Sequence, residues 1–130
     1  MTAPMISIVD DDQSVRDGLV DLLTSMGFDV KAFEVAEHFL RSSRVDCTSC
    51  LITDVRMPGM NGLELHDRLL ASGKRIPTIV ITAFPTDAER ARALEAGVAG
   101  YLTKPFDDNE LVACIHTLSV TSPPANRRPS

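Results

Sequence analysis

Residues 5–12 read M-I-S-I-V-D-D-D, a short apolar run that gives way at once to three aspartates. Nearly continuous apolar runs rich in β-branched residues are typical of strands that are covered on both faces. The same composition returns in residues 50–53 and 78–82, and residues 30–33 and 99–103 are two further strand candidates. The sequence therefore predicts five short strands.

Longer amphipathic segments separate these strands and have recognisable helix ends. The first has apolar residues at helical spacing, and Gly27 can supply a left-handed cap; these residues are Val15, Leu19, Leu22, Leu23 and Met26. Asn61 with Glu64, Thr86 with Glu89, and Asp107 with Glu110 have the spacing of reciprocal helix caps. Gly73 and Gly97 are expected to end two of the helices, and residues 36–43 have the weakest helical pattern.

Five strands alternating with five helices predict an α/β fold of the (βα)5 type. Crossovers of this length imply a parallel sheet with right-handed connections. Ligands of such sheets bind outside the carboxyl ends of the strands. The residues at these strand ends are therefore the first candidates for a functional site.

Composition excludes several classes of function. The 130 residues allow one domain, with 13 basic and 18 acidic residues and a net charge of −5. The first 120 residues hold all 18 acids and 11 bases, so their charge of −7 argues against DNA binding through phosphates. There is no Trp and one Tyr, which leaves no aromatic platform for single strands. With no apolar run long enough for a membrane span and no secretory signal, a cytoplasmic location is expected.

Polar residues stand at four of the five predicted strand ends: Asp10 and Asp11, Asp54, Thr82, and Lys104. Carboxylates that converge on one edge repel each other by about 4 kcal/mol per pair at 4 Å and an effective dielectric of 20. A bound cation would relieve this repulsion. Because the candidate ligands are hard oxygen atoms, Mg²⁺ suits the site better than Zn²⁺. Asp12 is expected only to cap the first helix.

Lys104 and Thr82 add groups that can hold an anion at the same edge. The Lys104–Pro105 bond is a candidate cis peptide, which would orient the lysine, and the small Ala83 beside Thr82 leaves room for a tetrahedral group. A carboxylate, a divalent cation, a lysine and a hydroxyl are groups that sites of phosphoryl transfer use. Aspartate can itself be the nucleophile and form an aspartyl phosphate.

Four motifs in order resemble the receiver domain of two-component response regulators, and most closely receivers of the FixJ-like type. They are V-D-D-D (9–12), T-D-V-R-M-P-G-M-N-G (53–62), I-T-A (81–83) and K-P-F (104–106), with Tyr101 between the last two. The resemblance spans residues 4–120. It implies a flavodoxin-like sheet with strand order 2-1-3-4-5 and a receiver domain over residues 1–120.

The resemblance also implies a role for each matching residue. Asp54 would accept a phosphoryl group from the phosphohistidine of a histidine kinase. Asp10, Asp11, Asp54 and the backbone carbonyl of Arg56 would bind Mg²⁺. Thr82 and Lys104 would hold the phosphoryl oxygens, and Tyr101 would turn inward as Thr82 moves. The face formed by the fourth helix, fifth strand and fifth helix would then change partners, such as a phosphotransfer protein, or form a phosphorylation-dependent dimer.

Alternative functions stay open at this point. Phosphatases of the haloacid-dehalogenase type also use an aspartyl nucleophile, but they place an acidic residue two positions later, where this chain has Arg56. A slow switch is therefore preferred to an enzyme. Residues 121–130 resemble a flexible Pro/Ser-rich tail, which favours a single-domain regulator. A receiver cut from a FixJ-like DNA-binding transcription regulator is the alternative.

Three cysteines and three histidines lie away from the predicted strand ends. Cys47 and Cys50 form a C-x-x-C pair, but a zinc site would need two more ligands. Ordinary packing of Cys50 is preferred to a redox pair. His38, His66 and His116 are expected at surface or half-buried helix positions and not as phosphoryl carriers.

Overall fold

The computed structural model describes residues 4–118 and contains five strands, five α-helices and one 3₁₀ helix within them. In chain order these are β1 (Met5–Val9), α1 (Gln13–Ser25), β2 (Asp29–Phe33), α2 (Ala36–Leu40), η1 (Ser43–Cys47), β3 (Thr48–Asp54), α3 (Gly62–Ala71), β4 (Thr78–Thr82), α4 (Asp87–Ala96), β5 (Gly100–Thr103) and α5 (Asp108–Thr117). The predicted tail, residues 121–130, lies outside the described residues.

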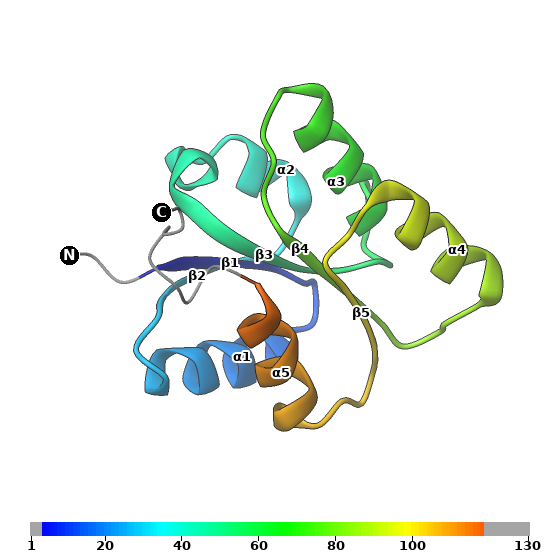
Figure 1. The fold of residues 1–130 in the computed structure, drawn as a ribbon. Coiled ribbons are helices and arrows are strands. Elements are labelled where there is room, and N and C mark those ends of the chain that lie inside the picture. Colours follow the sequence, from blue (N-terminus) through cyan, green and yellow to red (C-terminus); the bar gives the residue numbers. More distant parts are fainter. Residues whose placement is uncertain (1–3, 119–130) are drawn as a thin grey trace, which may run out of the picture.

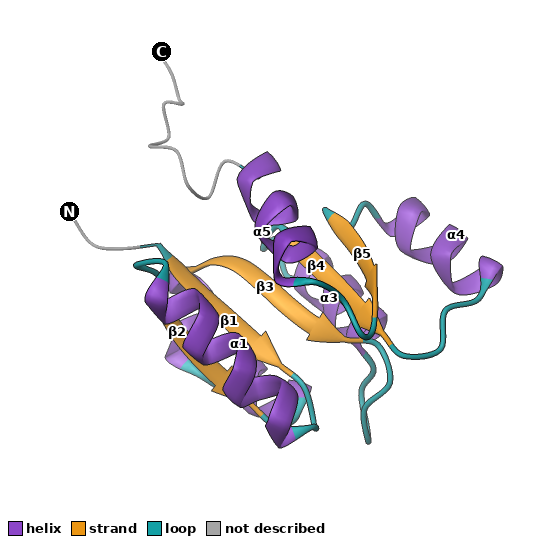
Figure 2. Ribbon diagram, turned by 90° about the horizontal axis from the view of Figure 1, so that it is seen from below, coloured by secondary structure: helices purple, strands orange, loops and turns teal. Residues whose placement is uncertain are grey.

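The sheet confirms the predicted topology. Its strands are ordered β2-β1-β3-β4-β5 and every neighbouring pair is parallel. Helices α1 and α5 cover one face, and α2, α3 and α4 cover the other (Figure 1). The strand arrows all point to the same edge (Figure 2), so the carboxyl ends of all five strands lie together.

Burial explains why three of the strands are so apolar. Every residue of β1 and β4 is buried, as are the last five residues of β3, because helices pack on both faces of these strands. The edge strand β2 is only partly buried. Ile6, Ile52 and Ile81 face α1 and α5, and Leu51 with Phe39 forms part of a second cluster under α2 and α3.

Most predicted helix ends are confirmed. Asn61 and Glu64 form a reciprocal cap on α3, with Glu64 N–H 2.9 Å from Asn61 Oδ1 and Asn61 N–H 2.8 Å from Glu64 Oε1. Gly27, Gly73 and Gly97 have positive φ angles at the ends of α1, α3 and α4. Together these local signals fix where the helices begin and end.

Four expectations need correction. The strand predicted at residues 50–53 begins earlier, at Thr48, since it pairs with β1 from Met5 onward. The helix predicted over residues 36–43 ends at Leu40 and is followed by η1. Glu89 does not return to the start of α4. His66 is buried, with 4% of its surface exposed, because it lies on the face of α3 that packs on the sheet.

Candidate functional site

The polar residues predicted at the strand ends do gather at one edge of the sheet. Asp10 follows β1 directly and Lys104 follows β5, whereas Asp54 and Thr82 are the last residues of β3 and β4. Asp10 and Thr82 are fully buried, Asp54 is 6% exposed and Asp11 is exposed. Four separate segments of the chain therefore supply one site.

Lys104 joins the two buried carboxylates. Its Nζ lies 3.0 Å from Asp10 Oδ2 and 3.3 Å from Asp54 Oδ2, and only 18% of its side chain is exposed. Its predicted cis bond to Pro105 is present. One carboxylate oxygen each of Asp10, Asp11 and Asp54 lie within 4.8 Å of one another. The site thus holds three carboxylates against one lysine.

This crowding changes the acidity of Asp54 and Lys104. Burial raises the pKa of Asp54, the charge of Asp10 raises it further, and Lys104 and the N–H of Arg56 oppose both effects. Burial alone would lower the pKa of Lys104, but hydrogen bonds and charges from Asp10 and Asp54 outweigh it and raise that pKa. Lys104 therefore stays protonated, and the formal charges of the three carboxylates and the lysine sum to −2.

The loop after β1 holds Asp10 by its backbone. The N–H of Asp12 donates to Asp10 Oδ1 at 2.9 Å, and Arg16 Nη1 donates to the carbonyl of Asp10 at 2.6 Å. Asp12 caps α1, as predicted, through the N–H of Ser14 at 2.9 Å. Asp10 is thus oriented by its own loop, while Asp11 between these two residues stays exposed.

The start of α3 packs against the backbone of Asp54. A Cβ added to Gly62 would lie 2.3 Å from the carbonyl oxygen of Asp54, which is too close for any side chain. The N–H of Gly62 donates to Val55 O at 3.0 Å, and Val55 N–H donates to Ile81 O at 2.9 Å. The absence of a side chain at Gly62 lets α3 hold the peptide that carries Asp54.

Thr82 connects the site to the loop after β4. Its hydroxyl accepts a hydrogen bond from Phe84 N–H at 3.1 Å, and its carbonyl accepts one from Lys104 N–H at 2.7 Å. Phe84 is 67% exposed, and the Arg56 guanidinium lies 5.8 Å from the centre of its ring. The loops after β3 and β4 therefore touch each other beside Asp54.

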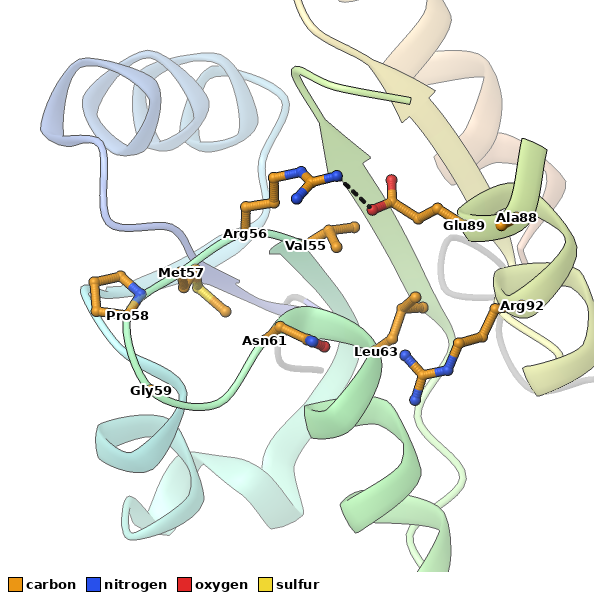
Figure 3. Close-up of a pocket in the computed structure, with 10 residues that line it drawn as sticks. All are labelled: Val55, Arg56, Met57, Pro58, Gly59, Asn61, Leu63, Ala88, Glu89 and Arg92. Carbon is orange, nitrogen blue, oxygen red and sulfur yellow. Dashed lines mark ion pairs between the residues drawn. The ribbon is translucent and has the colours of Figure 1, made fainter. Parts of the chain in front are cut away.

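Glu89 is the residue that sequence reasoning missed. It accepts a hydrogen bond from the Tyr101 hydroxyl at 2.7 Å and pairs with Arg56 Nη2 at 3.6 Å. Figure 3 shows this ion pair across a cavity of about 650 Å³ between the loop after β3 and α4. The spacing from Thr86 predicted a cap, and no local signal pointed to these two distant partners.

The two cysteines of the C-x-x-C pair lie in different environments. Cys50 is fully buried in the core under α1 and α5, whereas Cys47 is exposed and its Sγ lies 3.9 Å from Ser43 O. Burial, with a smaller effect of Cys114, raises the pKa of Cys50 to about 12. Cys50 is thus a packed core thiol.

Fold and site together define a parallel α/β domain of the flavodoxin-like class, with an acidic cluster and a lysine at the carboxyl ends of its strands. The model of the response regulator receiver domain matches residues 6–116. The chain belongs to this family and is a receiver domain of the two-component signalling systems, in which such domains act as switches. No helix within residues 4–118 has the length and apolarity to cross a membrane.

Relatives and solved structures agree with this assignment. Nodulation protein W of Bradyrhizobium diazoefficiens is 39% identical over 88% of this chain and 50% of its own length. The transcriptional regulatory protein FixJ of the same organism is 36% identical over 92% of this chain and 58% of its own length. The chain thus spans about half the length of such curated relatives.

Two structures have the same fold at substantial identity. The response regulator StyR is 41% identical with a TM-score of 0.82, over 98% of this chain and 63% of that one. The N-terminal part of FixJ is 36% identical with a TM-score of 0.78, over 89% of this chain and 93% of that one. The match to the FixJ fragment supports the flavodoxin-like fold with the strand order that this chain has.

Proposed function

We propose that Asp54 accepts a phosphoryl group from the phosphohistidine of a sensor histidine kinase. A carboxylate oxygen of Asp54 attacks the phosphorus, the P–N bond breaks, and the donor imidazole keeps the bonding electron pair. The observation that carries this proposal is the position of Lys104, which bridges Asp54 and Asp10 at 3.3 and 3.0 Å. Its ammonium group lies where the oxygens of a phosphoryl group on Asp54 would develop charge.

Thr82 would give the second contact to the phosphoryl group. Its hydroxyl accepts from Phe84 N–H in the resting domain and keeps its own proton for donation. A phosphoryl oxygen on Asp54 would draw this proton, and the loop that starts at Ala83 would move with Thr82. Tyr101 would then turn inward, and the α4–β5–α5 face would change the proteins it binds.

The acidic cluster fits a magnesium ion. Asp10, Asp11 and Asp54 offer hard oxygen ligands within 4.8 Å, and the backbone carbonyl of Arg56 is the fourth proposed ligand. Lys104 leaves about two negative charges uncompensated, which is the charge that one divalent cation would neutralise. Bound Mg²⁺ would supply charge compensation for the phosphoryl oxygens during transfer.

Hydrolysis of the aspartyl phosphate is expected to be slow. An acid or base two residues after the nucleophile would speed this step, but Arg56 stands there. The guanidinium of Arg56 is directed to Glu89 and to the carbonyl of Phe84, at 3.6 and 3.4 Å. We therefore prefer a timed switch to a phosphatase of the haloacid-dehalogenase type.

For the output we propose protein contacts at the α4–β5–α5 face, as in a single-domain regulator or a phosphorelay. A second candidate is the receiver part of a DNA-binding regulator, because the relatives are about twice as long and one is called a transcriptional regulatory protein. The length of the open reading frame, and capture of partners with phosphorylated and unphosphorylated protein, would separate these two outputs.

Labelling with radioactive acetyl phosphate tests the phosphoacceptor. We expect Mg²⁺-dependent labelling of the wild-type domain, none in Asp54→Asn, and unchanged labelling in Asp21→Asn, which removes an exposed acid on α1. Label that persists in Asp54→Asn would overturn the assignment. Multiple-turnover release of phosphate from simple phosphomonoesters would favour the phosphatase.

A further inference from the structure

Glu89 has a hydrogen bond to Tyr101 that the proposed function does not use. Its side chain is 11% exposed and reaches two other parts of the domain at once. Oε1 accepts from the Tyr101 hydroxyl on β5 at 2.7 Å, and Oε2 lies 3.6 Å from Arg56 Nη2 in the loop after Asp54 (Figure 3). One carboxylate therefore ties together the phosphoacceptor loop, α4 and the tyrosine of the proposed switch.

The contacts of Glu89 with Tyr101 and Arg56 take the place of a hydrogen bond at the start of its own helix. Glu89 is the third residue of α4, where a glutamate commonly accepts from the N–H of the capping residue. In α3 the equivalent Glu64 does so, at 2.8 Å from Asn61 N. Thr86 caps α4 through Glu89 N–H at 3.0 Å, but the Glu89 carboxylate points to Tyr101 and Arg56. The tertiary contacts are thus preferred to the cap.

Helix α4 depends on such polar contacts, because few apolar side chains hold it. Ala93 is its one fully buried residue, and Leu94 is 67% exposed. Besides Glu89, the pair between Arg92 and Asp67 at 2.9 Å joins α4 to α3. A helix attached in this way can shift when the nearly buried carboxylate of Glu89 changes its partner.

Tyr101 is held on two sides. Its hydroxyl bonds Glu89, and the Arg90 guanidinium lies 4.8 Å from the centre of its ring. The ring also packs against the small cluster that contains Val80 and Ala93. Turning the ring inward must break the bond to Glu89 and leave a nearly buried carboxylate with Arg56 alone.

We propose that Glu89 is a positioning residue that latches Tyr101 and the Arg56 loop to α4 in the unphosphorylated domain. This rests on the proposed function, since it concerns the switch that follows phosphorylation of Asp54. Movement of the loop beside Asp54 displaces Arg56, and movement of Thr82 draws Tyr101 inward. The two contacts that form the latch, Glu89 with Arg56 and Glu89 with Tyr101, therefore break together. Loss of a hydrogen bond to an ionised group shifts such an equilibrium by a factor of about 10 to 100.

The first test is the alkaline titration of Tyr101, which is the one tyrosine in a chain without tryptophan. Burial, the hydrogen bond to Glu89 and the charge of Glu89 raise the pKa of Tyr101 to about 12. We expect the absorbance change of the phenolate to begin at lower pH in Glu89→Gln, and at the wild-type pH in Glu95→Gln, which removes an exposed charge from the same helix. Circular dichroism at each pH limits the comparison to folded protein.

The second test follows the single tyrosine by NMR after ring ¹³C labelling. Phosphorylation of the wild type with acetyl phosphate and Mg²⁺ should move the Tyr101 signal. Unphosphorylated Glu89→Gln should have its signal displaced in the same direction and accept phosphate about tenfold faster, whereas Glu95→Gln should match the wild type.

A Glu89→Gln variant with the wild-type titration and the wild-type signal would overturn the latch. A wild-type protein that acetyl phosphate fails to label would overturn the proposed function instead. In that case a lowered Tyr101 titration in Glu89→Gln would still support the positioning role of Glu89.

Discussion

Asp54 shows at the scale of one residue how burial and charge oppose each other. It is 6% exposed and lies beside a second buried carboxylate, Asp10, so its ionised form is penalised twice. Lys104 is the counter-charge that contacts both carboxylates. A carboxylate that is only partly compensated is well suited to bind a cation and to react with an electrophilic phosphoryl group.

The three thiols should react at very different rates. Cys47 is exposed, Cys114 is half-buried, and burial raises the pKa of Cys50 to about 12, so little of its reactive thiolate exists at pH 8. We expect one fast equivalent with a disulfide reagent in native protein and three after unfolding in urea. Cys47→Ser should remove the fast phase. Equal fast reaction of Cys47 and Cys50 would instead revive a redox role for the pair.

His66 should make the domain less stable in mild acid. Burial lowers the pKa of His66, and its Nδ1 has no hydrogen-bond partner among the described residues. The unfolded chain then takes up a proton at His66 more readily than the folded chain does. The stability of the domain is therefore unaffected by His66 above about pH 6.5 and decreases as the pH falls below it. Urea midpoints between pH 7.5 and 5.5 should fall less in His66→Met than in the wild type.

His116→Gln is the matched control, because His116 is exposed on α5. It should retain the full wild-type loss of stability in acid. A loss of the same size in His66→Met would show that other groups cause the acid sensitivity.

At the scale of elements, α3 approaches β3 most closely at Gly62. A Cβ built at this residue would lie nearer to another atom than one built at any other glycine of residues 4–118. The position of the Asp54 carbonyl requires Gly62. We expect Gly62→Ala to lower the free energy of unfolding by about 1–3 kcal/mol, because the added methyl group must displace the backbone of Asp54. Urea denaturation measures this change.

Gly18→Ala is the matched control for the same substitution in a helix. Nothing lies within 4 Å of a Cβ at Gly18, in the middle of α1, so alanine should stabilise the domain by about 0.5–1 kcal/mol. Opposite signs for the two variants would support the close approach at Gly62. A neutral Gly62→Ala would show that the start of α3 can move away from Asp54.

The starts of α3 and α4 show when a local cap signal in the sequence predicts the contacts that form. Asn61 and Glu64 cap α3 as their spacing predicts, because both partners are only three residues apart. Thr86 and Glu89 have the same spacing, but Glu89 bonds Tyr101 instead. Tyr101 is twelve residues away in the chain, and only the parallel pairing of β4 with β5 brings it under α4.

At the scale of the whole molecule, repulsion between the carboxylates of the site lowers the stability of the fold, and a bound cation would restore it. The first 120 residues carry −7, and the cluster of Asp10, Asp11, Asp54 and Lys104 concentrates about −2 of this in one place. We expect millimolar Mg²⁺ to raise the unfolding temperature. The free energy of unfolding should rise by about 2.7 kcal/mol when the ion is at 100 times its dissociation constant.

Asp11→Asn should separate the charge repulsion within the cluster from the stabilisation by bound Mg²⁺. It removes an exposed charge from the cluster, so in EDTA it should be at least as stable as the wild type, while the gain from Mg²⁺ should largely vanish. Ca²⁺ and Na⁺ at equal ionic strength serve as controls for screening. An unchanged response to Mg²⁺ in Asp11→Asn would mean that the ion binds elsewhere.

The sequence alone was sufficient for the class of fold and for the candidate site. Apolar runs such as residues 5–9 and 78–82 are typical of buried strands, and the segments between them, with helix caps and helical spacing, are typical of crossover helices. Since parallel strands bring their carboxyl ends to one edge, polar residues at separate strand ends could be grouped without knowing any distance.

Tertiary structure decided what depends on contacts between distant segments. It extended β3 back to Thr48, buried His66, and turned Glu89 from its own helix to Tyr101 and Arg56. It also set which carboxylates Lys104 reaches. Local sequence determines the elements because their hydrogen bonds and caps are local, but the partner of a long polar side chain is chosen among groups that only the folded chain brings within reach.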